Sequence, residues 1–305
     1  MIKPFSSTEF AHYLENFIEN DKFISSHNSK PQTTYKLGHN QFSHLNEDEW
    51  RDYVQRGLTR ARTPLYSQAH RAPADPSSLP DSVDWVSKGG VTPVKDQGSC
   101  GSCWSFSTTG AIEGAEFAKY GELVSLSEQM LVDCDNRRNG GSDLGCNGGL
   151  MDDAFTWISK NGGLCLEDEY PYVSGKSGRS NKCGQATCTK KAHSEVKSFT
   201  DVEPNSDLAL MSALAQQPVA IAIEADQKAF QLYESGVFTG TCGANLDHGV
   251  LAVGYGSLDG VDYYKVKNSW GPKWGQDGFI LLQRGVEQKE GQCGILSGPP
   301  SYPVL

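Results

Sequence analysis

A cysteine at the start of a predicted helix is the first residue of this sequence with a capacity for chemistry. Residues 103–120 carry alanines and Ile112 at helical spacing, and Gly121 follows as a C-terminal cap, so a helix is predicted to begin at Cys103. A thiol there lies beside unpaired backbone N–H groups and the positive end of the helix dipole, which both favour the thiolate. The segment therefore predicts a nucleophilic cysteine.

The helix alone does not ionise this thiol under acidic conditions. Lowering the pKa of a thiol by about 4 from its usual value near 8.5 takes roughly 5.5 kcal/mol. A helix terminus contributes at most about 2 kcal/mol. A second positive charge, such as an imidazolium, must therefore lie beside Cys103.

Two of the seven histidines, His193 and His248, follow residue 79 and are candidates for that charge. His193 lies in a charged stretch typical of a solvated surface. His248 lies between Asp247 and an apolar run, which favours a fixed, semi-buried ring. Asn268 could hold that ring in one tautomer, with Trp270 shielding the hydrogen bond from water. We therefore expect His248 to be the partner of the cysteine.

Gln97 can direct its side-chain amide at a developing oxyanion, beside the backbone N–H of Cys103. The pair Cys100-x-x-Cys103 has two other interpretations, a zinc half-site and a redox pair. Zinc would need a second close pair, and Cys183-x4-Cys188 is a poor one. A redox pair needs a preceding βαβ pattern, which we do not find. The combination of residues thus favours nucleophilic catalysis.

Composition limits the class of protein. The 305 residues carry 27 basic and 37 acidic side chains, a net charge of −10, with no block of Lys or Arg, which argues against nucleic-acid partners. No apolar stretch reaches the roughly 18 residues that a membrane span needs. Nine cysteines suggest four disulfides and one free thiol in an oxidising compartment. The N-terminal residues lack the apolar core of a signal peptide, so we expect the sequence to start downstream of one.

The chain divides by composition into a polar N-terminal part and a glycine- and cysteine-rich remainder. Residues 1–60 are predicted to be helical, with Phe10, Leu14, Phe17, Ile18, Phe23 and Ile24 forming one amphipathic face. Residues 61–78 are typical of an exposed linker. Helices are predicted at 103–120, 125–133 and 150–159, and strands at 218–223, 249–254, 263–267 and 279–282. Helices first and strands later indicate two lobes with a cleft between them.

At these residues the chain resembles the papain-like cysteine proteases of the cathepsin L-like branch. The resemblance lies in Cys100-Gly-Ser-Cys-Trp, in 91–98, 146–151 and 247–256, and in Asn268-Ser-Trp-Gly. It implies an α+β, papain-like two-lobe fold for residues 79–305. The helical left lobe would span about 79–185 and the antiparallel β-barrel right lobe about 186–305, with the active-site cleft between them and a helical pro-domain before them. The implied roles are nucleophile for Cys103, acid and base for His248, orienting group for Asn268 and oxyanion donor for Gln97, with no cofactor or metal.

The first sixty residues resemble the inhibitory propeptide of this family. Its helical motif appears as Glu9, Tyr13, Phe17, Asn20, Ile24 and Asn28, and its second motif as Gly38, Asn40, Phe42 and His44. The sequence departs from these motifs at Tyr13, where the family has Arg, and at His44, where it has Asp. The resemblance implies a zymogen cleaved within 72–79. We hypothesise that acid loosens this segment through His44 if that ring is buried, although protonation would also attract the segment to the acidic enzyme, so the direction stays open.

The resemblance also implies disulfides and a substrate pocket. Cys100 would pair with Cys146, Cys242 with Cys293, Cys134 with Cys183, and Cys165 with Cys188, although Cys183 and Cys188 may exchange partners. The implied substrate-binding residues are Gly148, Gly149, Leu150, Met151, Ala222, Leu246, Asp247, Gly249, Trp270 and Gly298. These side chains predict an endopeptidase that prefers a bulky hydrophobic P2 residue and takes P2 Arg poorly. The stretch 296–303 is about one residue longer than the family pattern, which leaves the place of Gly298 open.

The expected partners are protein and peptide substrates, the chain's own propeptide and cystatin-type inhibitors. The expected state is a monomer in a lysosome or vacuole, or secreted. The alternative is a non-catalytic homologue that only binds protein. That interpretation calls for a damaged catalytic pair, whereas Cys103, His248, Asn268 and Gln97 are all intact.

Overall fold

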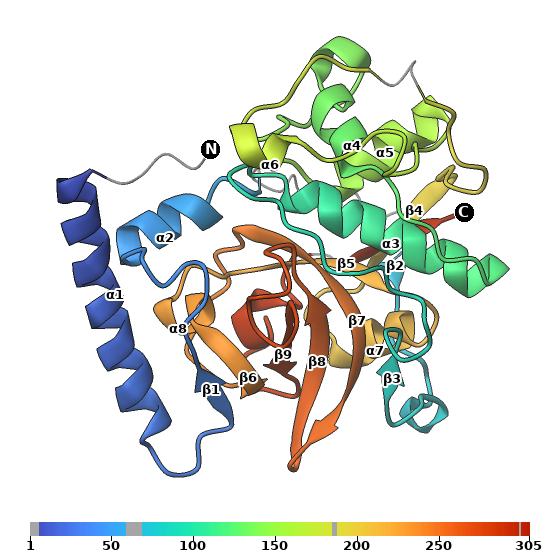
Figure 1. The fold of residues 1–305 in the computed structure, drawn as a ribbon. Coiled ribbons are helices and arrows are strands. Elements are labelled where there is room, and N and C mark those ends of the chain that lie inside the picture. The colour runs from blue at the N-terminus through green and yellow to red at the C-terminus, as the bar shows by residue number, and fades with distance from the viewer. Residues whose placement is uncertain (1–5, 59–68, 185–187, 299) are drawn as a thin grey trace.

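The structure, a computed structural model, describes residues 6–58, 69–184, 188–298 and 300–305. A lobe of helices lies beside a lobe built on a β-sheet, and the N-terminal helices lie against the β lobe (Figure 1). None of the helices that it describes is long and apolar enough to cross a membrane.

The central helix of the helical lobe is α3 (Cys103–Tyr120), and it has the bounds that the sequence predicted. It ends at Gly121, whose φ of 74° is the left-handed conformation of a C-terminal cap. Gly110 and Gly114 let α3 lie close to the β lobe, because a methyl group at Gly110 would be 2.8 Å from Leu251. The lobe also contains α4 (Glu128–Cys134), η2 (Arg137–Asn139), α5 (Met151–Asn161) and α6 (Ser174–Ser177).

The β lobe is a sheet with the strand order β1-β6-β9-β8-β7-β5-β10-β4-β2. Its strands are β4 (Ser198–Val202), β5 (Val219–Ile223), β6 (Tyr233–Phe238), β7 (His248–Leu258), β8 (Val261–Lys267), β9 (Phe279–Gln283) and β10 (Ser301–Val304). Its helices are α7 (Asp207–Leu214), α8 (Lys228–Gln231) and η4 (Gln292–Gly294). Most neighbours are antiparallel as expected, but β6 pairs with β9, and β2 with β4, in parallel.

The start of the 79–305 region lies in the β lobe and not in the helical lobe, where the expected division at residue 185 puts it. Strand β3 (Val83–Asp84) pairs with β7 of the β lobe, where Gly254 leaves room for the carbonyl of Val83. The indole of Trp85 donates to the carbonyl of Leu214 in the same lobe. These pairings place the start of the region in the β lobe, because the edge of β7 offers an unpaired backbone that local sequence does not reveal.

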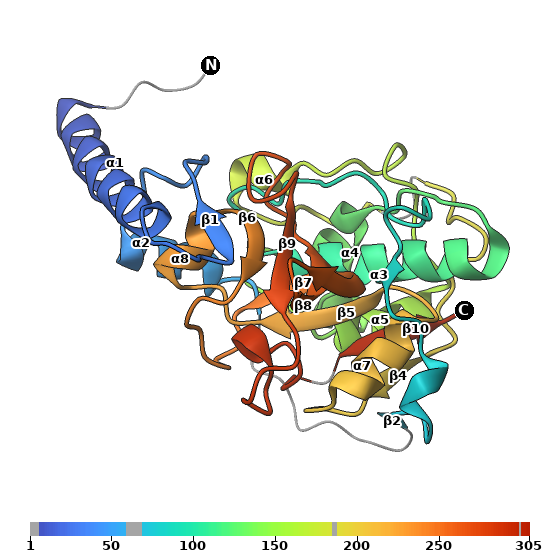
Figure 2. The same cartoon turned by 90° about the horizontal axis from the view of Figure 1, so that it is seen from below.

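The N-terminal segment contains α1 (Ser7–Asn28), β1 (Tyr35–Leu37) and α2 (Glu47–Val54), followed by β2 (Ala69–His70) and η1 (Pro76–Ser78). Helix α1 projects beyond the rest of the molecule (Figure 2). Its expected apolar face is largely exposed, with Phe10, Leu14, Phe17 and Ile18 between 40% and 59% accessible. Of the predicted face, Ile24 is buried as expected, and the buried face of α1 is completed by Asn16 and Asn20, because these two amides bond backbone carbonyls of residues 43–45.

The predicted linker is not loose throughout. Residues 59–68 lie outside the described part, but Ala69 and His70 form β2 and pair with Asp201 and Val202 of β4. The chain is therefore anchored to the sheet just before the stretch in which cleavage is expected.

Candidate active site

Cys103 is the unpaired cysteine of the described chain, and it lies fully buried at the first residue of α3. The backbone N–H of Gly249 donates to its Sγ at 3.3 Å. The backbone N–H of Trp104, in the first helical turn, is a second donor. Donors of this kind stabilise negative charge on sulfur, so the local geometry suits a thiolate.

His248 and Asn268 lie at neighbouring ends of two paired strands. Strand β7 begins at His248, and β8 ends at Lys267, just before Asn268. Nε2 of His248 lies 2.7 Å from Oδ1 of Asn268, which also accepts the backbone N–H of Ser269. Because Oδ1 only accepts, the proton is on Nε2, and Nδ1 of the neutral ring is left to act as a base. Trp270 stacks on the ring at 4.5 Å and shields this hydrogen bond.

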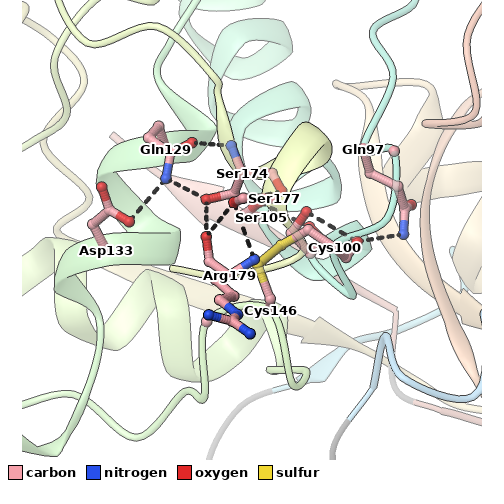
Figure 3. Close-up of a disulfide and its surroundings, with 12 residues drawn as sticks. Gln97, Cys100, Ser105, Gln129, Asp133, Cys146, Ser174, Ser177 and Arg179 are labelled. Carbon is pink, nitrogen blue, oxygen red and sulfur yellow. Dashed lines mark hydrogen bonds between the residues drawn. A yellow bond between two sulfur atoms is a disulfide. The ribbon is translucent and has the colours of Figure 1, made fainter. Parts of the chain in front are cut away.

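Gln97 is buried near the Cys100–Cys146 disulfide, and both ends of its amide have partners. Nε2 donates to the carbonyl of Cys100 at 3.1 Å, and Oε1 accepts the hydroxyl of Ser269 at 2.7 Å. An amide nitrogen carries two hydrogens, so one N–H remains for an oxyanion. Figure 3 shows the Gln97 bond next to the disulfide that joins Cys100 to Cys146.

The eight other cysteines form four disulfides. The structure pairs Cys100 with Cys146, Cys134 with Cys183, Cys165 with Cys188, and Cys242 with Cys293. The redox interpretation of Cys100 and Cys103 is therefore wrong, because Cys100 is bonded elsewhere. The choice left open for Cys134 falls on Cys183.

Several predicted pocket residues gather around Leu58 of the N-terminal segment. Gly149 forms a parallel bridge with Leu58. A methyl group at Gly249 would lie 3.2 Å from Sδ of Met151 and 3.4 Å from Cδ2 of Leu58. The side chain of Leu58 thus lies in an apolar recess between the two lobes.

Three further pocket residues form the wall behind this recess. Ala222 of β5 lies opposite Gly249 of β7. A methyl group at Gly298 would lie 2.6 Å from Leu246 and 3.7 Å from Ala222. Gly298 therefore adjoins the expected lining despite the longer C-terminal stretch. Of the remaining predicted residues, Gly148 and Leu150 flank Gly149, and the carbonyl of Asp247 faces Gly57.

Gly57 is a functional residue that the sequence analysis missed. A methyl group there would lie 2.3 Å from Sγ of Cys103. The carbonyl of Arg56 lies against Gly101 in the same way. The backbone of residues 56–58 therefore covers the sulfur. The one available signal was the glycine itself, because only a residue without a side chain allows so close an approach.

Aromatic side chains hold this segment in place, and the sequence analysis missed two of the three. Phe42, Trp50 and Tyr53 surround Trp270, with ring centroids 5.7, 4.9 and 6.2 Å away. The indole of Trp50 donates to the carbonyl of Ala225, and the hydroxyl of Tyr53 donates to that of Gly98. The same Trp270 stacks on the ring of His248, so the N-terminal segment packs against the indole that covers this histidine.

The burial of the site shifts the pKa values of both Cys103 and His248. Burial raises the pKa of Cys103 to about 12, and hydrogen bonds from Gly249 and Trp104 offset only part of this. Burial likewise lowers the pKa of His248 to about 4, against the opposite effect of Asn268. Both shifts favour a neutral thiol and a neutral ring. In the covered site, burial therefore disfavours the charged thiol and ring, and the backbone of residues 56–58 also blocks access to the sulfur.

Comparisons with known proteins agree with this geometry. A sequence model of papain family cysteine proteases matches residues 79–303, and a model of the cathepsin propeptide inhibitor domain matches residues 3–50. The probable cysteine protease RD21C of Arabidopsis thaliana is 48% identical over 292 residues, which are 95% of this chain and 62% of that protein. Germination-specific cysteine protease 1 of the same plant is 47% identical over 295 residues, covering 94% and 76%.

A solved structure has the same arrangement of segments. The Amb a 11 cysteine protease, a major ragweed pollen allergen, in its proform superposes with a TM-score of 0.84 at 37% identity, covering 100% of this chain and 89% of that one. The predicted α+β, papain-like fold with a preceding helical segment is thereby confirmed. The chain spans less than two thirds of the length of the first relative named above.

Proposed function

Because the chain belongs to the papain family of cysteine proteases and carries a cathepsin-type propeptide, we propose that it is the zymogen of an acid-activated endopeptidase. In this proposal residues 1–60 are the inhibitory propeptide, residues 61–78 the cleavable linker and residues 79–305 the peptidase. The observation that carries it is the backbone of residues 56–58 lying on the unpaired thiol of Cys103.

The chemistry is acyl transfer through Cys103 and His248. Removal of the propeptide readmits water, which lets the proton of Cys103 pass to Nδ1 of His248. The thiolate attacks the peptide carbonyl, and the free N–H of Gln97 and the backbone N–H of Cys103 bond the oxyanion. The C–N bond breaks as His248 gives its proton to the leaving amine. Water, deprotonated by His248, then attacks the thioester and releases the acid and Cys103.

Asn268 is a positioning group in this scheme. Its Oδ1 accepts from Nε2 of His248, which keeps Nδ1 directed at the sulfur through both proton transfers. Trp270 keeps water from this bond by stacking on the ring. Loss of the asparagine would therefore lower kcat more than it raises KM.

The specificity follows from the recess that Leu58 occupies. Its neighbours Met151, Gly249 and Ala222 are apolar or small, so a bulky hydrophobic P2 side chain is expected to fill the same space. Gly298 lies at the back of the recess, and Gly298→Glu would place a carboxylate there. We expect that variant to gain activity on P2 Arg and to lose activity on P2 Leu.

Labelling with an epoxysuccinyl inhibitor tests the function. The purified chain is held at about pH 5 under mild reduction, and the adduct is mapped by mass spectrometry. We expect one adduct on Cys103, in a species shortened at a site within residues 72–79, and none in Cys103→Ala. Absence of label from both the acid-treated chain and a chain expressed without its propeptide would favour the non-catalytic binding protein.

Partners and location follow from the same proposal. Substrates are proteins and peptides, the propeptide is the intramolecular inhibitor, and cystatin-type inhibitors would compete for the cleft. A monomer in a vacuole or lysosome, or outside the cell, suits four disulfides and acid activation.

A further inference from the structure

A buried carboxyl group outside the catalytic centre holds the strand on which substrate would lie. Oδ1 of Asp143, a residue only 1% exposed, accepts the backbone N–H of Leu150 at 2.9 Å. A second bond, from the N–H of Leu144 to the carbonyl of Gly148, closes the same loop at 2.9 Å. Gly149, between the two bonded residues, is the one that pairs with Leu58.

The carboxyl group lies directly beneath this strand. A methyl group at Gly149 would be 2.7 Å from Oδ1 of Asp143 and 2.5 Å from the indole of Trp104. Trp104 follows the nucleophile in α3, and its indole donates to the carbonyl of Gly145 in the same loop. The position of the strand relative to the sulfur is therefore set from below by Asp143 and Trp104.

A second buried acid, Asp135, is hydrogen-bonded to Asp143, and it is fully inaccessible. Its carboxylate also accepts the backbone N–H of Ser142. No N–H or O–H of the described residues reaches Oδ2 of either aspartate. Two carboxylates bond each other only if one carries a proton, so the pair holds a shared proton.

The surroundings of Asp135 and Asp143 favour the state in which the pair holds a proton. Burial raises the pKa of both carboxyl groups, and their mutual repulsion raises that of Asp143 further. The other charged group that acts on both is Asp153 in the first turn of α5, and it is also an acid. The leading contributions to either shift come from burial, hydrogen bonds and neighbouring acids, and none of them comes from a cation of the described residues.

We propose that Asp143 is a positioning residue for the substrate strand 148–150, and that this role depends on the proton that it shares with Asp135. The inference rests on the proposed protease function. Asp143 touches neither the substrate nor the reacting atoms. It acts through its hydrogen bond to the backbone N–H of Leu150.

The sign of the pH effect follows from the shared proton. The ordered strand requires the proton, so its stabilisation is present below the raised pKa and is lost as the pH rises through it. Above that pH two like charges share a buried space and separate, and Leu150 loses its acceptor. Substrate affinity then falls, whereas the bonds of Cys103 and His248 are unchanged. KM should therefore rise with pH while kcat changes little.

Asp143→Asn keeps the hydrogen bond that positions Leu150 but removes the titratable proton shared with Asp135. The amide oxygen still accepts from Leu150, and the amide nitrogen donates permanently to Asp135. In the acid-processed, active-site-titrated enzyme we expect the wild-type KM for a peptide substrate to rise about fivefold or more as the pH is raised from about 5 through the raised pKa of the aspartate pair. Asp143→Asn should abolish most of this rise. Asp143→Ala should raise KM across the whole range, by about fivefold or more, with kcat nearly unchanged.

Asp259→Asn is the matched control, because it makes the same chemical change at an exposed turn between β7 and β8. It should keep the wild-type KM profile. A rise of KM in Asp143→Asn equal to that of the wild type would overturn the proposal, even if Asp143→Ala failed to fold. Failure of the proposed function would look different, since no variant would then be labelled at Cys103 or cleave the peptide.

Discussion

The rings of Tyr13 and His44 meet edge to face, with centroids 5.0 Å apart and planes at 83°. These are the two positions at which the sequence departs from the propeptide motifs, Tyr for Arg and His for Asp. Because the positions are in contact, the motif residues would face each other as an ion pair. The chain has replaced that charge pair by an aromatic contact.

A double-mutant cycle tests this relationship. In the Cys103→Ser background, which prevents processing, Tyr13→Arg and His44→Asp each remove the aromatic contact, and His44→Asp adds a negative charge near Glu49. We expect each single variant to lower the unfolding midpoint in denaturant. The double variant should recover about 0.5–1 kcal/mol of the summed loss. Strictly additive losses would show that the two positions do not act as a pair.

His44 itself is only half-buried, so the condition attached to the earlier hypothesis, a buried neutral ring, is not met. The structure therefore offers no buried neutral ring at His44 whose protonation would loosen the segment. His70 is likewise half-buried, but both of its ring nitrogens lie 3.0 Å from hydroxyl groups.

Gly57→Ala should weaken autoinhibition. The new methyl group would lie 2.3 Å from Sγ of Cys103, so the backbone has to lift and Leu58 must leave its recess. Overpacking of this kind costs about 1–3 kcal/mol, which corresponds to roughly 5- to 150-fold weaker coverage. The measurement is the rate at which a small epoxysuccinyl inhibitor labels Cys103 in the unprocessed chain at neutral pH.

Gln55→Ala, an exposed change two residues earlier, serves as the control and should label at the wild-type rate. Wild-type labelling of Gly57→Ala would mean that the segment accommodates the methyl group and that steric contact at the sulfur does not maintain latency.

Removal of the Cys165–Cys188 disulfide should affect stability rather than catalysis. The bridge closes a loop with a sequence separation of 23 residues, so its loss should lower the free energy of unfolding by about 3 kcal/mol. None of the recess residues lies within this loop, so KM and kcat of Cys165→Ala/Cys188→Ala should stay within about twofold of wild type at ambient temperature. Denaturant unfolding of the inhibitor-blocked enzyme, with Ser198→Ala as a surface control, measures the first effect. A fall in kcat at unchanged stability would contradict this assignment.

Local pattern predicted the elements that carry the chemistry. Helix α3 has the predicted bounds because its periodicity, its terminal glycine and the cysteine at its start all act within one helix. The bond between His248 and Asn268 was expected because His248 stands at the start of one apolar strand and Asn268 follows the end of another. The pairing of these two strands brings the two side chains together.

Long-range partners could not be predicted in the same way. The exposed face of α1 and the buried one have similar periodicity, and what decides between them is the carbonyls of residues 43–45 that Asn16 and Asn20 reach. Gly57 contacts Cys103, which lies 46 positions later, and Asp143 bonds Leu150, which lies 7 positions later. No local pattern records either contact. The pairing of β3 with β7 is of the same kind.

His70 anchors the linker to the β lobe, and its titration should help to trigger processing. Its Nδ1 and Nε2 each lie 3.0 Å from a hydroxyl, of Tyr302 and Ser212 respectively, and burial lowers its pKa. A lowered pKa in the docked state means that docking is strongest above the ordinary histidine pKa of about 6.5 and weakens as the pH falls below it. His70→Gln keeps a donor and an acceptor but cannot gain charge. We expect the midpoint of acid processing, followed by gel electrophoresis over a pH series, to move to lower pH by a few tenths of a unit to about one unit. His193→Gln, an exposed histidine of the peptidase, should leave the midpoint unchanged, and equal midpoints for all three chains would show that β2 detaches without titration of His70.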